Sequence, residues 1–223
     1  MSSAQRPVVK PARTPRAAQP SEQARPRTKP AAVRREELLD AAERLFLDKG
    51  MAATSVDEIV TLANVAKGTF YLHFASKEQL LLGLQDRFVN GFRVIVDKAL
   101  ARRKPDDHRG RLRTWLQTMM AYYLEKVALH DLVFHEYHPD ERDTVQDKPV
   151  ILELSEMIRA GVRDGAFDVD DPKLTAMMLF YALHAAADVA VSKKLEGAAY
   201  KRHLATLESF VLRGVGSAPA QRS

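Results

Sequence analysis

The side chains best suited to recognition chemistry lie between residues 65 and 78, in the run VAKGTFYLHFASKE. Phe70 and Phe74 are four residues apart, so in a helix they share one side and can face a core. Four other positions of this short helix would point hydrogen-bonding groups outward: Lys67, Thr69, Tyr71 and His73. Core packing alone does not account for this pattern, which favours contact with another molecule.

A second short apolar helix is predicted directly before this segment, over residues 56–63. Only Asn64 separates the two helices, and asparagine tolerates the left-handed conformation that a tight corner requires. Two short helices, a tight corner and a polar-faced second helix predict a helix-turn-helix. In that motif the second helix enters the major groove of DNA.

Two further helices must position this motif. The run over 34–47 has apolar residues at helical spacing, and Gly50 follows as its C-cap. Thr54 or Ser55 would cap the next helix, with Glu58 as the partner in a capping box. A fourth helix starts after Ser76 and runs to about residue 103, which is longer than a small three-helix domain needs. We expect it to be the rod that joins the motif to the rest of the chain.

Composition excludes several other classes of site. The chain has no cysteine, which excludes disulfides, thiolate metal sites and thiol nucleophiles. It has no glycine-rich phosphate loop and no nucleophile elbow, so an enzyme is not expected. No secretory signal pattern and no uninterrupted apolar run of about 18 residues is present. We therefore expect a soluble, cytoplasmic, nucleoid-associated protein with no membrane partner.

The positive charge is concentrated at the N-terminus. The formal net charge is +5, residues 1–30 contribute +6, and the remainder sums to −1. The same segment holds six of the eleven prolines, and this composition predicts a disordered basic arm. Two interpretations stay open: an arm that adds salt-sensitive phosphate affinity beside a DNA-binding domain, or a solubilising extension.

About fifty residues carry a recognisable pattern: Leu38 to Ala42, Leu45, Phe46, Gly50, Thr54 to Ile59, Ala63, Val65, Gly68 to Phe74 and Ser76 to Leu80. This pattern resembles the DNA-binding domain of TetR-family transcriptional regulators. Asn64 and Ala66 depart from the family pattern, which usually has Gly at the corner and Ser or Thr as the cap.

The resemblance implies an all-α fold. Its expected parts are a three-helix DNA-binding domain over 32–92 with the helix-turn-helix at 55–74, a linking long helix, a helical ligand-binding and dimerisation domain over 93–214, and a flexible tail over 215–223. Helical stripes in the second half of the sequence agree with this, and no strand-like alternation is present. After about residue 92 the resemblance is only generic.

Residue chemistry and the resemblance together suggest roles in DNA binding. Lys67 can reach a guanine edge or a phosphate, and Thr69 can bind a phosphate or touch a thymine methyl. Gly68 leaves room for the backbone to approach the duplex. Tyr71 and His73 resemble phosphate-contacting positions of the family. The complete expected set is Thr54, Lys67, Gly68, Thr69, Tyr71, His73 and Lys77.

The family also implies a homodimer that binds a palindromic operator in double-stranded DNA, most often as a repressor. The last two predicted helices carry the stripes expected to meet a partner subunit. These stripes could instead pack within one subunit. The expected dimer residues are Ala182, Ala185, Ala186, Val189, Leu204, Leu207 and Val211.

A small apolar or aromatic effector is the remaining expected partner, and its pocket would need aromatic and soft apolar lining. The same residues could equally form plain core, and His184 could pair with Asp188. The histidines and carboxylates between His130 and Asp140 fit no standard zinc spacing, so neither a metal nor a cofactor is expected. The expected pocket residues are Trp115, Met119, Tyr122, Tyr123, Phe134, Met157, Met178, Tyr181 and His184.

The main alternative is a nucleoid-organising DNA-binding protein on the same scaffold that senses no ligand. Saturable binding of a small molecule that releases DNA would separate the two functions, as would an enclosed apolar cavity.

Overall fold

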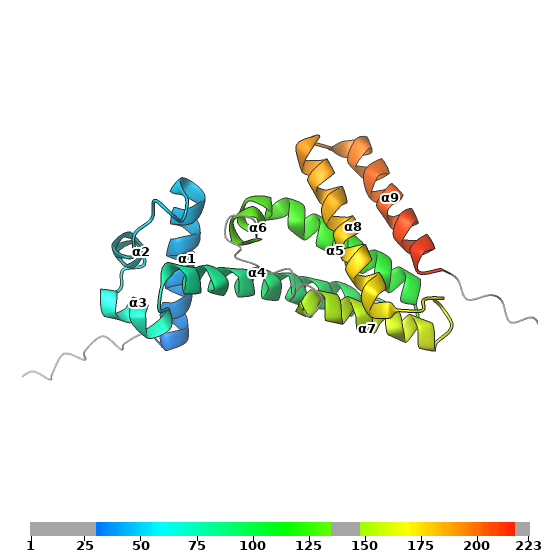
Figure 1. Cartoon of the computed structure of the whole chain (residues 1–223), viewed down its shortest axis with the longest axis horizontal. Coiled ribbons are helices and arrows are strands. Elements are labelled where there is room, and N and C mark those ends of the chain that lie inside the picture. Colours follow the sequence, from blue (N-terminus) through cyan, green and yellow to red (C-terminus); the bar gives the residue numbers. More distant parts are fainter. Residues whose placement is uncertain (1–29, 135–147, 217–223) are drawn as a thin grey trace, which may run out of the picture.

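The computed structural model describes residues 30–134 and 148–216, and these residues form helices joined by turns, without strands. The all-α expectation is confirmed (Figure 1). The helices in chain order are α1 Ala31–Lys49, α2 Val56–Leu62, α3 Lys67–His73, α4 Lys77–Leu100, α5 His108–Glu125, α6 Val127–Phe134, α7 Pro149–Arg163, α8 Pro172–Ser192 and α9 Gly197–Gly214.

Helices α1, α2 and α3 and the first turns of α4 form a small head at one end of the molecule (Figure 1). Each helix contributes apolar side chains to one buried cluster because its apolar residues repeat at helical spacing. The largest fully buried members are Leu38, Leu39, Ile59, Phe70, Leu80 and Leu84. The head is therefore a packed unit that fixes the orientation of α3.

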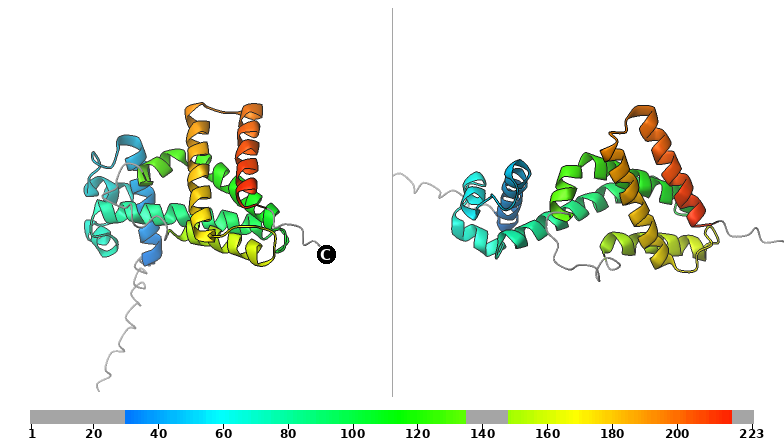
Figure 2. Two further views of the ribbon diagram at one scale, coloured as in Figure 1. Left: turned by 45° about the vertical axis from the view of Figure 1, so that its right-hand side comes forward. Right: turned by 45° about the horizontal axis from the view of Figure 1, so that its top comes forward.

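Helix α4 is the rod expected from the sequence. Its 24 residues span about 36 Å at 1.5 Å per residue. Its first turns belong to the head, and its later buried residues Phe88, Phe92 and Val96 belong to the same core cluster as α5. Figure 2 shows the rod running from the head beneath α5 and α6.

Helices α5 to α9 form the second half of the molecule, with α8 and α9 side by side (Figures 1 and 2). Asp107 and Asp171 cap α5 and α8 through their side chains, and Pro149 and Pro172 occupy the first positions of α7 and α8. Helix α6 buries Leu129, His130, Leu132 and Val133 against the rest of the molecule.

Helix α8 is apolar along its length but only partly buried in this subunit. By length and hydropathy alone it could cross a membrane, and only 28% of its most apolar 18-residue stretch is buried in the molecule. A helix that is apolar on its exposed side needs a partner, and a second subunit is the partner considered below.

Candidate nucleic-acid interface

Helix α3 is attached to the head by two neighbouring aromatic side chains. Phe70 is fully buried, and Phe74, directly after the helix, is 4% exposed. The two rings lie 6.0 Å apart, and Arg35 of α1 lies over the Phe74 ring. Asn64 has a φ of +52°, so the corner before α3 uses the left-handed conformation expected of it.

The rest of α3 faces solvent. Lys67, Gly68 and Tyr71 are exposed, whereas Thr69 and His73 are partly exposed. A β-carbon added at Gly68 would meet no atom within 4 Å, so nothing inside the subunit requires glycine there. The five positions predicted on this helix therefore form one outward surface, which is free to contact another molecule.

Lys67 makes an exposed ion pair with Asp57 of α2, at 2.8 Å. The hydrogen bond from Lys67 to this carboxylate raises the pKa of the lysine, which keeps it cationic. An ion pair between exposed side chains contributes little to stability, so Lys67 can exchange Asp57 for a phosphate or a base edge at little cost.

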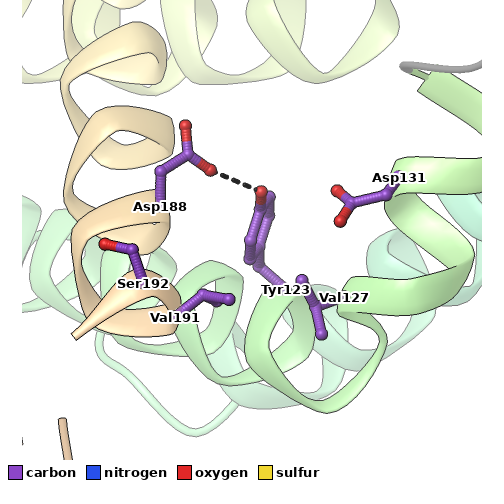
Figure 3. Close-up of a pocket in the computed structure, with 6 residues that line it drawn as sticks. All are labelled: Tyr123, Val127, Asp131, Asp188, Val191 and Ser192. Atoms are coloured by element: carbon purple, nitrogen blue, oxygen red, sulfur yellow. Dashed lines mark hydrogen bonds between the residues drawn. The ribbon is translucent and has the colours of Figure 1, made fainter. Parts of the chain in front are cut away.

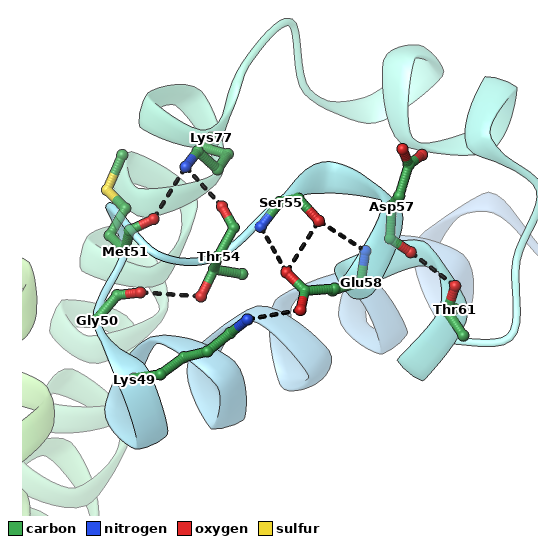
Figure 4. Close-up of polar contacts among 9 residues, drawn as sticks. All are labelled: Lys49, Gly50, Met51, Thr54, Ser55, Asp57, Glu58, Thr61 and Lys77. Carbon is green, nitrogen blue, oxygen red and sulfur yellow. Dashed lines mark hydrogen bonds and ion pairs between the residues drawn. The ribbon is translucent and has the colours of Figure 1, made fainter.

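Thr54 and Lys77 differ from the sequence-based expectation (Figure 4). Thr54 is buried, at 1% exposed, and its hydroxyl donates to the Gly50 carbonyl at 2.9 Å. The Lys77 ammonium donates to the carbonyls of Met51 and Thr54, at 2.9 and 2.6 Å. Both side chains hold the loop between α1 and α2, because they satisfy carbonyls that no helix satisfies. We therefore reassign both from DNA contact to a structural role.

The capping box at α2 is present as expected (Figure 4). Ser55 Oγ accepts from the Glu58 amide at 3.2 Å, and Glu58 Oε2 accepts from the Ser55 amide at 2.9 Å. Glu58 also pairs with Lys49 at 2.6 Å. The Lys49 ammonium and the Ser55 amide and hydroxyl lower the pKa of Glu58 from 4.5 to about 2.

Arg87 joins the head to the rod, a role that the sequence did not suggest. From α4 it forms ion pairs with three α1 carboxylates, those of Glu36, Asp40 and Glu43. Acidic residues at positions 36, 40 and 43 share one side of α1, and that spacing is the signal that sequence reasoning missed.

Most residues predicted to line a ligand pocket pack against one another instead. Trp115, Met119, Tyr122 and Tyr123 are buried, and Phe134 and Met157 are partly buried against the core. The centre of the Tyr122 ring lies 4.9 Å from that of Phe88 and 5.9 Å from that of Phe92. The Tyr122 hydroxyl also donates to the Phe88 carbonyl at 3.0 Å. These aromatic side chains form the core that attaches α5 to the rod.

A pocket of about 300 Å³ lies between the α5–α6 corner and α8 (Figure 3). Of the nine predicted residues, only Tyr123 lines it. Figure 3 shows the Tyr123 ring between two carboxylates, and its hydroxyl donates to Asp188 at 2.7 Å. Burial first, and then this bond to Asp188, raises the pKa of Tyr123. The lining residues are Tyr123, Val127, Asp131, Asp188, Val191 and Ser192.

The expected pairing of His184 with Asp188 is not formed. His184 Nδ1 lies 2.9 Å from the Phe180 carbonyl, and Asp188 instead accepts from Tyr123. Within residues 30–134 and 148–216 no group of three or more metal-ligating side chains comes together. His135, Glu136, His138 and Asp140 lie outside the described residues.

The outer face of α8 contains residues from both the predicted pocket set and the predicted dimer set. Met178 and Tyr181 were expected in the pocket, but they are 61% and 49% exposed. They share this face with Ala185 and Val189, because positions 178, 181, 185 and 189 repeat at helical spacing. Ala182, Ala186 and Leu204 are partly buried. Leu207 and Val211 are buried inside the subunit, so they cannot meet a partner as expected, whereas Phe210 is 54% exposed.

The head has three helices, and α3, the second helix of the helix-turn-helix, faces outward. This arrangement is typical of helix-turn-helix DNA-binding proteins. Two family models match this chain in succession. Residues 38–84 match the model described as "Bacterial regulatory proteins, tetR family", and residues 105–188 match "Tetracyclin repressor-like, C-terminal domain". The chain belongs to the TetR family of transcriptional regulators, as its sequence resemblance suggested.

Two relatives show how far the similarity extends. The transcriptional repressor KstR2 of Rhodococcus jostii is 32% identical over 152 residues, which cover 61% of this chain and 69% of that protein. The transcriptional activator FasR of Mycolicibacterium smegmatis is 32% identical over 140 residues, covering 63% of this chain. The match spans only 60% of FasR. The two relatives have opposite regulatory signs, so similarity to them does not assign one here.

A solved structure extends the similarity in fold across the second half. The regulator FadR of Bacillus subtilis, in complex with stearoyl-CoA, has a TM-score of 0.62 and 18% identity, and the match covers 81% of this chain and 97% of that one. This likeness concerns the fold.

Proposed function

We propose that this chain is a homodimeric regulator, a repressor as is usual in its family, that binds a palindromic operator through α3 of each subunit and is released by a small molecule. The observation that carries the proposal is the outer surface of α3, whose polar side chains are exposed or partly exposed and lie outside the buried core of the head. In a family of DNA-binding regulators, that surface is the part suited to the major groove.

Within the proposed interface, Lys67 reaches a guanine edge or a phosphate after it leaves Asp57. Thr69, Tyr71 and His73 supply hydroxyl and ring nitrogen groups for phosphate oxygens. Gly68 allows the duplex to approach the helix backbone. Thr54 and Lys77 support the loop behind this surface and are left out of the interface.

The outer face of α8 provides the proposed dimer contact. It carries Leu174, Met178, Tyr181 and Val189, which are 36–61% exposed, beside the small side chain of Ala185. Phe210 of α9 adds an exposed ring. Two such faces related by a twofold axis would bury apolar surface from both subunits, and the same axis would relate two half-sites in the operator.

For the effector, we propose the pocket between the α5–α6 corner and α8. Tyr123 lines it, and the neighbouring Tyr122 holds the Phe88 carbonyl of the rod. A ligand that moved α5 here would shift α4, and with it the separation of the two heads. Release then follows if the ligand binds the DNA-free arrangement more tightly than the DNA-competent one.

The lining of this pocket favours an effector without negative charge. Among the described residues, the lining contains the carboxylates of Asp131 and Asp188 and no lysine or arginine. Phenylbutylamine and phenylbutyrate share one aromatic body and differ in charge, so they are suitable matched probes. We expect the amine alone to raise the melting temperature, and Asp188→Asn to weaken that effect while Asp170→Asn preserves it. Equal stabilisation by both probes would contradict the assignment.

Selection of bound sequences from random duplex DNA tests the function itself. Full-length protein and a version starting at Ala31 should both enrich one inverted repeat. Loss of all binding without residues 1–30, with no shared sequence enriched by the full chain, would contradict the proposal and favour a nucleoid-organising protein.

A further inference from the structure

Leu72 is the most exposed of the large apolar side chains in the described residues. It is 83% exposed, compared with 68% for Val94 and 55% for Tyr71. It lies in α3, where every other position is either the core anchor Phe70, a glycine or a side chain that can form hydrogen bonds. An isolated exposed leucine is ordinary, but its position in this helix is not.

Leu72 lies at the centre of the outward surface of α3. Successive helix residues turn by about 100°, so Leu72 and Gly68 lie on one side, roughly opposite the buried Phe70. Lys67 and Tyr71 lie to one side of this centre, and Thr69 and His73 lie to the other. The two central positions therefore carry no side-chain hydrogen-bonding group.

Space around the two central residues is open. Nothing lies within 4 Å of a β-carbon built at Gly68, and Leu72 stands one turn further along. A duplex that approaches closely at Gly68 would meet the Leu72 side chain next. The flanking residues can bind polar groups, but the centre of the contact must be apolar.

The floor of the major groove offers one apolar group, the C5 methyl of thymine. Leucine cannot form hydrogen bonds with base edges, so it gains free energy there mainly by burying itself against that methyl. We propose that Leu72 is a specificity-determining residue that recognises a thymine methyl in each half-site. The inference depends on the proposed placement of α3 in the major groove.

The test is a double-mutant cycle between protein and DNA. Each thymine of the selected palindrome is replaced in turn by deoxyuridine, which removes only the methyl group. Wild-type protein should lose about fourfold in affinity for each methyl removed at one symmetric pair of positions, as expected when each half-site buries one methyl. Leu72→Ala should bind the thymine and deoxyuridine duplexes equally well at that pair.

Val94→Ala is the matched control, because it shortens an exposed apolar side chain of α4 outside the head. It should retain the full sensitivity of wild type to deoxyuridine. The inference is wrong if wild type binds the palindrome but no thymine methyl matters. It is also wrong if Leu72→Ala weakens binding while keeping the deoxyuridine effect. Failure of wild type to select any palindrome would instead contradict the proposed function, and this inference with it.

Discussion

At the scale of single residues, the structure of α3 distinguishes residues that pack in the head from residues that can only contact a partner, which the sequence alone does not. A residue can sit in a recognition helix because the head needs it, as Phe70 does, or because only a partner needs it. Gly68 and Leu72 belong to the second kind, since the subunit surrounds neither of them. Such residues can be changed without a cost in folding, and this makes their function testable.

Gly68→Ala gives opposite predictions for stability and for DNA binding. Alanine favours helix over glycine by up to about 1 kcal/mol, less near a helix end, and its β-carbon meets no atom in the subunit. The melting temperature should therefore stay the same or rise. Affinity for the selected palindrome should fall several-fold, because the added methyl separates helix and duplex. A variant that melts earlier but binds DNA normally would contradict this role of Gly68.

At the scale of helices, the head depends on polar contacts at the ends of α2. The pKa of Glu58 is lowered from 4.5 to about 2, so its charged form stabilises the folded head. This contribution is complete above about pH 4.5 and is lost as the pH falls toward 2. The difference in melting temperature between wild type and Glu58→Gln should thus be largest at neutral pH and shrink across that window. A difference that stays constant from pH 7 to pH 2 would contradict the charged capping box.

The junction between head and rod supplies a second prediction at this scale. Arg87→Ala leaves three carboxylates of α1 without their shared partner, so the free energy of unfolding should fall by about 0.5–3 kcal/mol in urea titrations. Arg93→Ala on the same helix removes only the pair with Glu153, whose side chains are 46% and 39% exposed. It should cost about 0–1 kcal/mol. Equal losses for the two variants would mean that Arg87 is not the anchor.

At the scale of the whole molecule, the exposed side of α8 is the feature that one subunit does not explain. Tyr181→Asp places a charge on that side, and the chain should remain folded because Tyr181 is 49% exposed. We expect it to be a monomer by sedimentation and to lose on the order of 100-fold in affinity for the palindrome, since the second head is no longer tethered. Val94→Asp is the control and should remain a dimer. A dimeric Tyr181→Asp protein would place the interface elsewhere.

Sequence reasoning succeeded where short-range physics decides. The family resemblance together with helical stripes predicts the all-α fold. Residue chemistry predicts the Asn64 corner and the Ser55–Glu58 capping box, because each depends on residues a few positions apart. It failed where side-chain direction depends on distant packing. Met178 and Leu207 have similar apolar character, yet one is exposed and the other is buried, and only the packing of α8 and α9 distinguishes them.

The same limit applies to the candidate sites. Thr54 and Lys77 belong to the recognised motif, but their hydrogen bonds to Gly50, Met51 and Thr54 follow from how the α1–α2 loop folds back on α4. Tyr123 could be marked as an aromatic lining residue, whereas its partner Asp188 is 65 positions away. Contacts of that range cannot be derived from spacing.

The most direct test of the account is the dependence of binding on half-site spacing. Affinity is measured for the selected palindrome and for a copy with about five base pairs, half a helical turn, inserted at its centre. If a rigid dimer presents two α3 helices at a fixed separation, the insertion should reduce affinity to that of a single half-site. Unchanged affinity for the spaced palindrome would contradict a dimer that reads both half-sites at once.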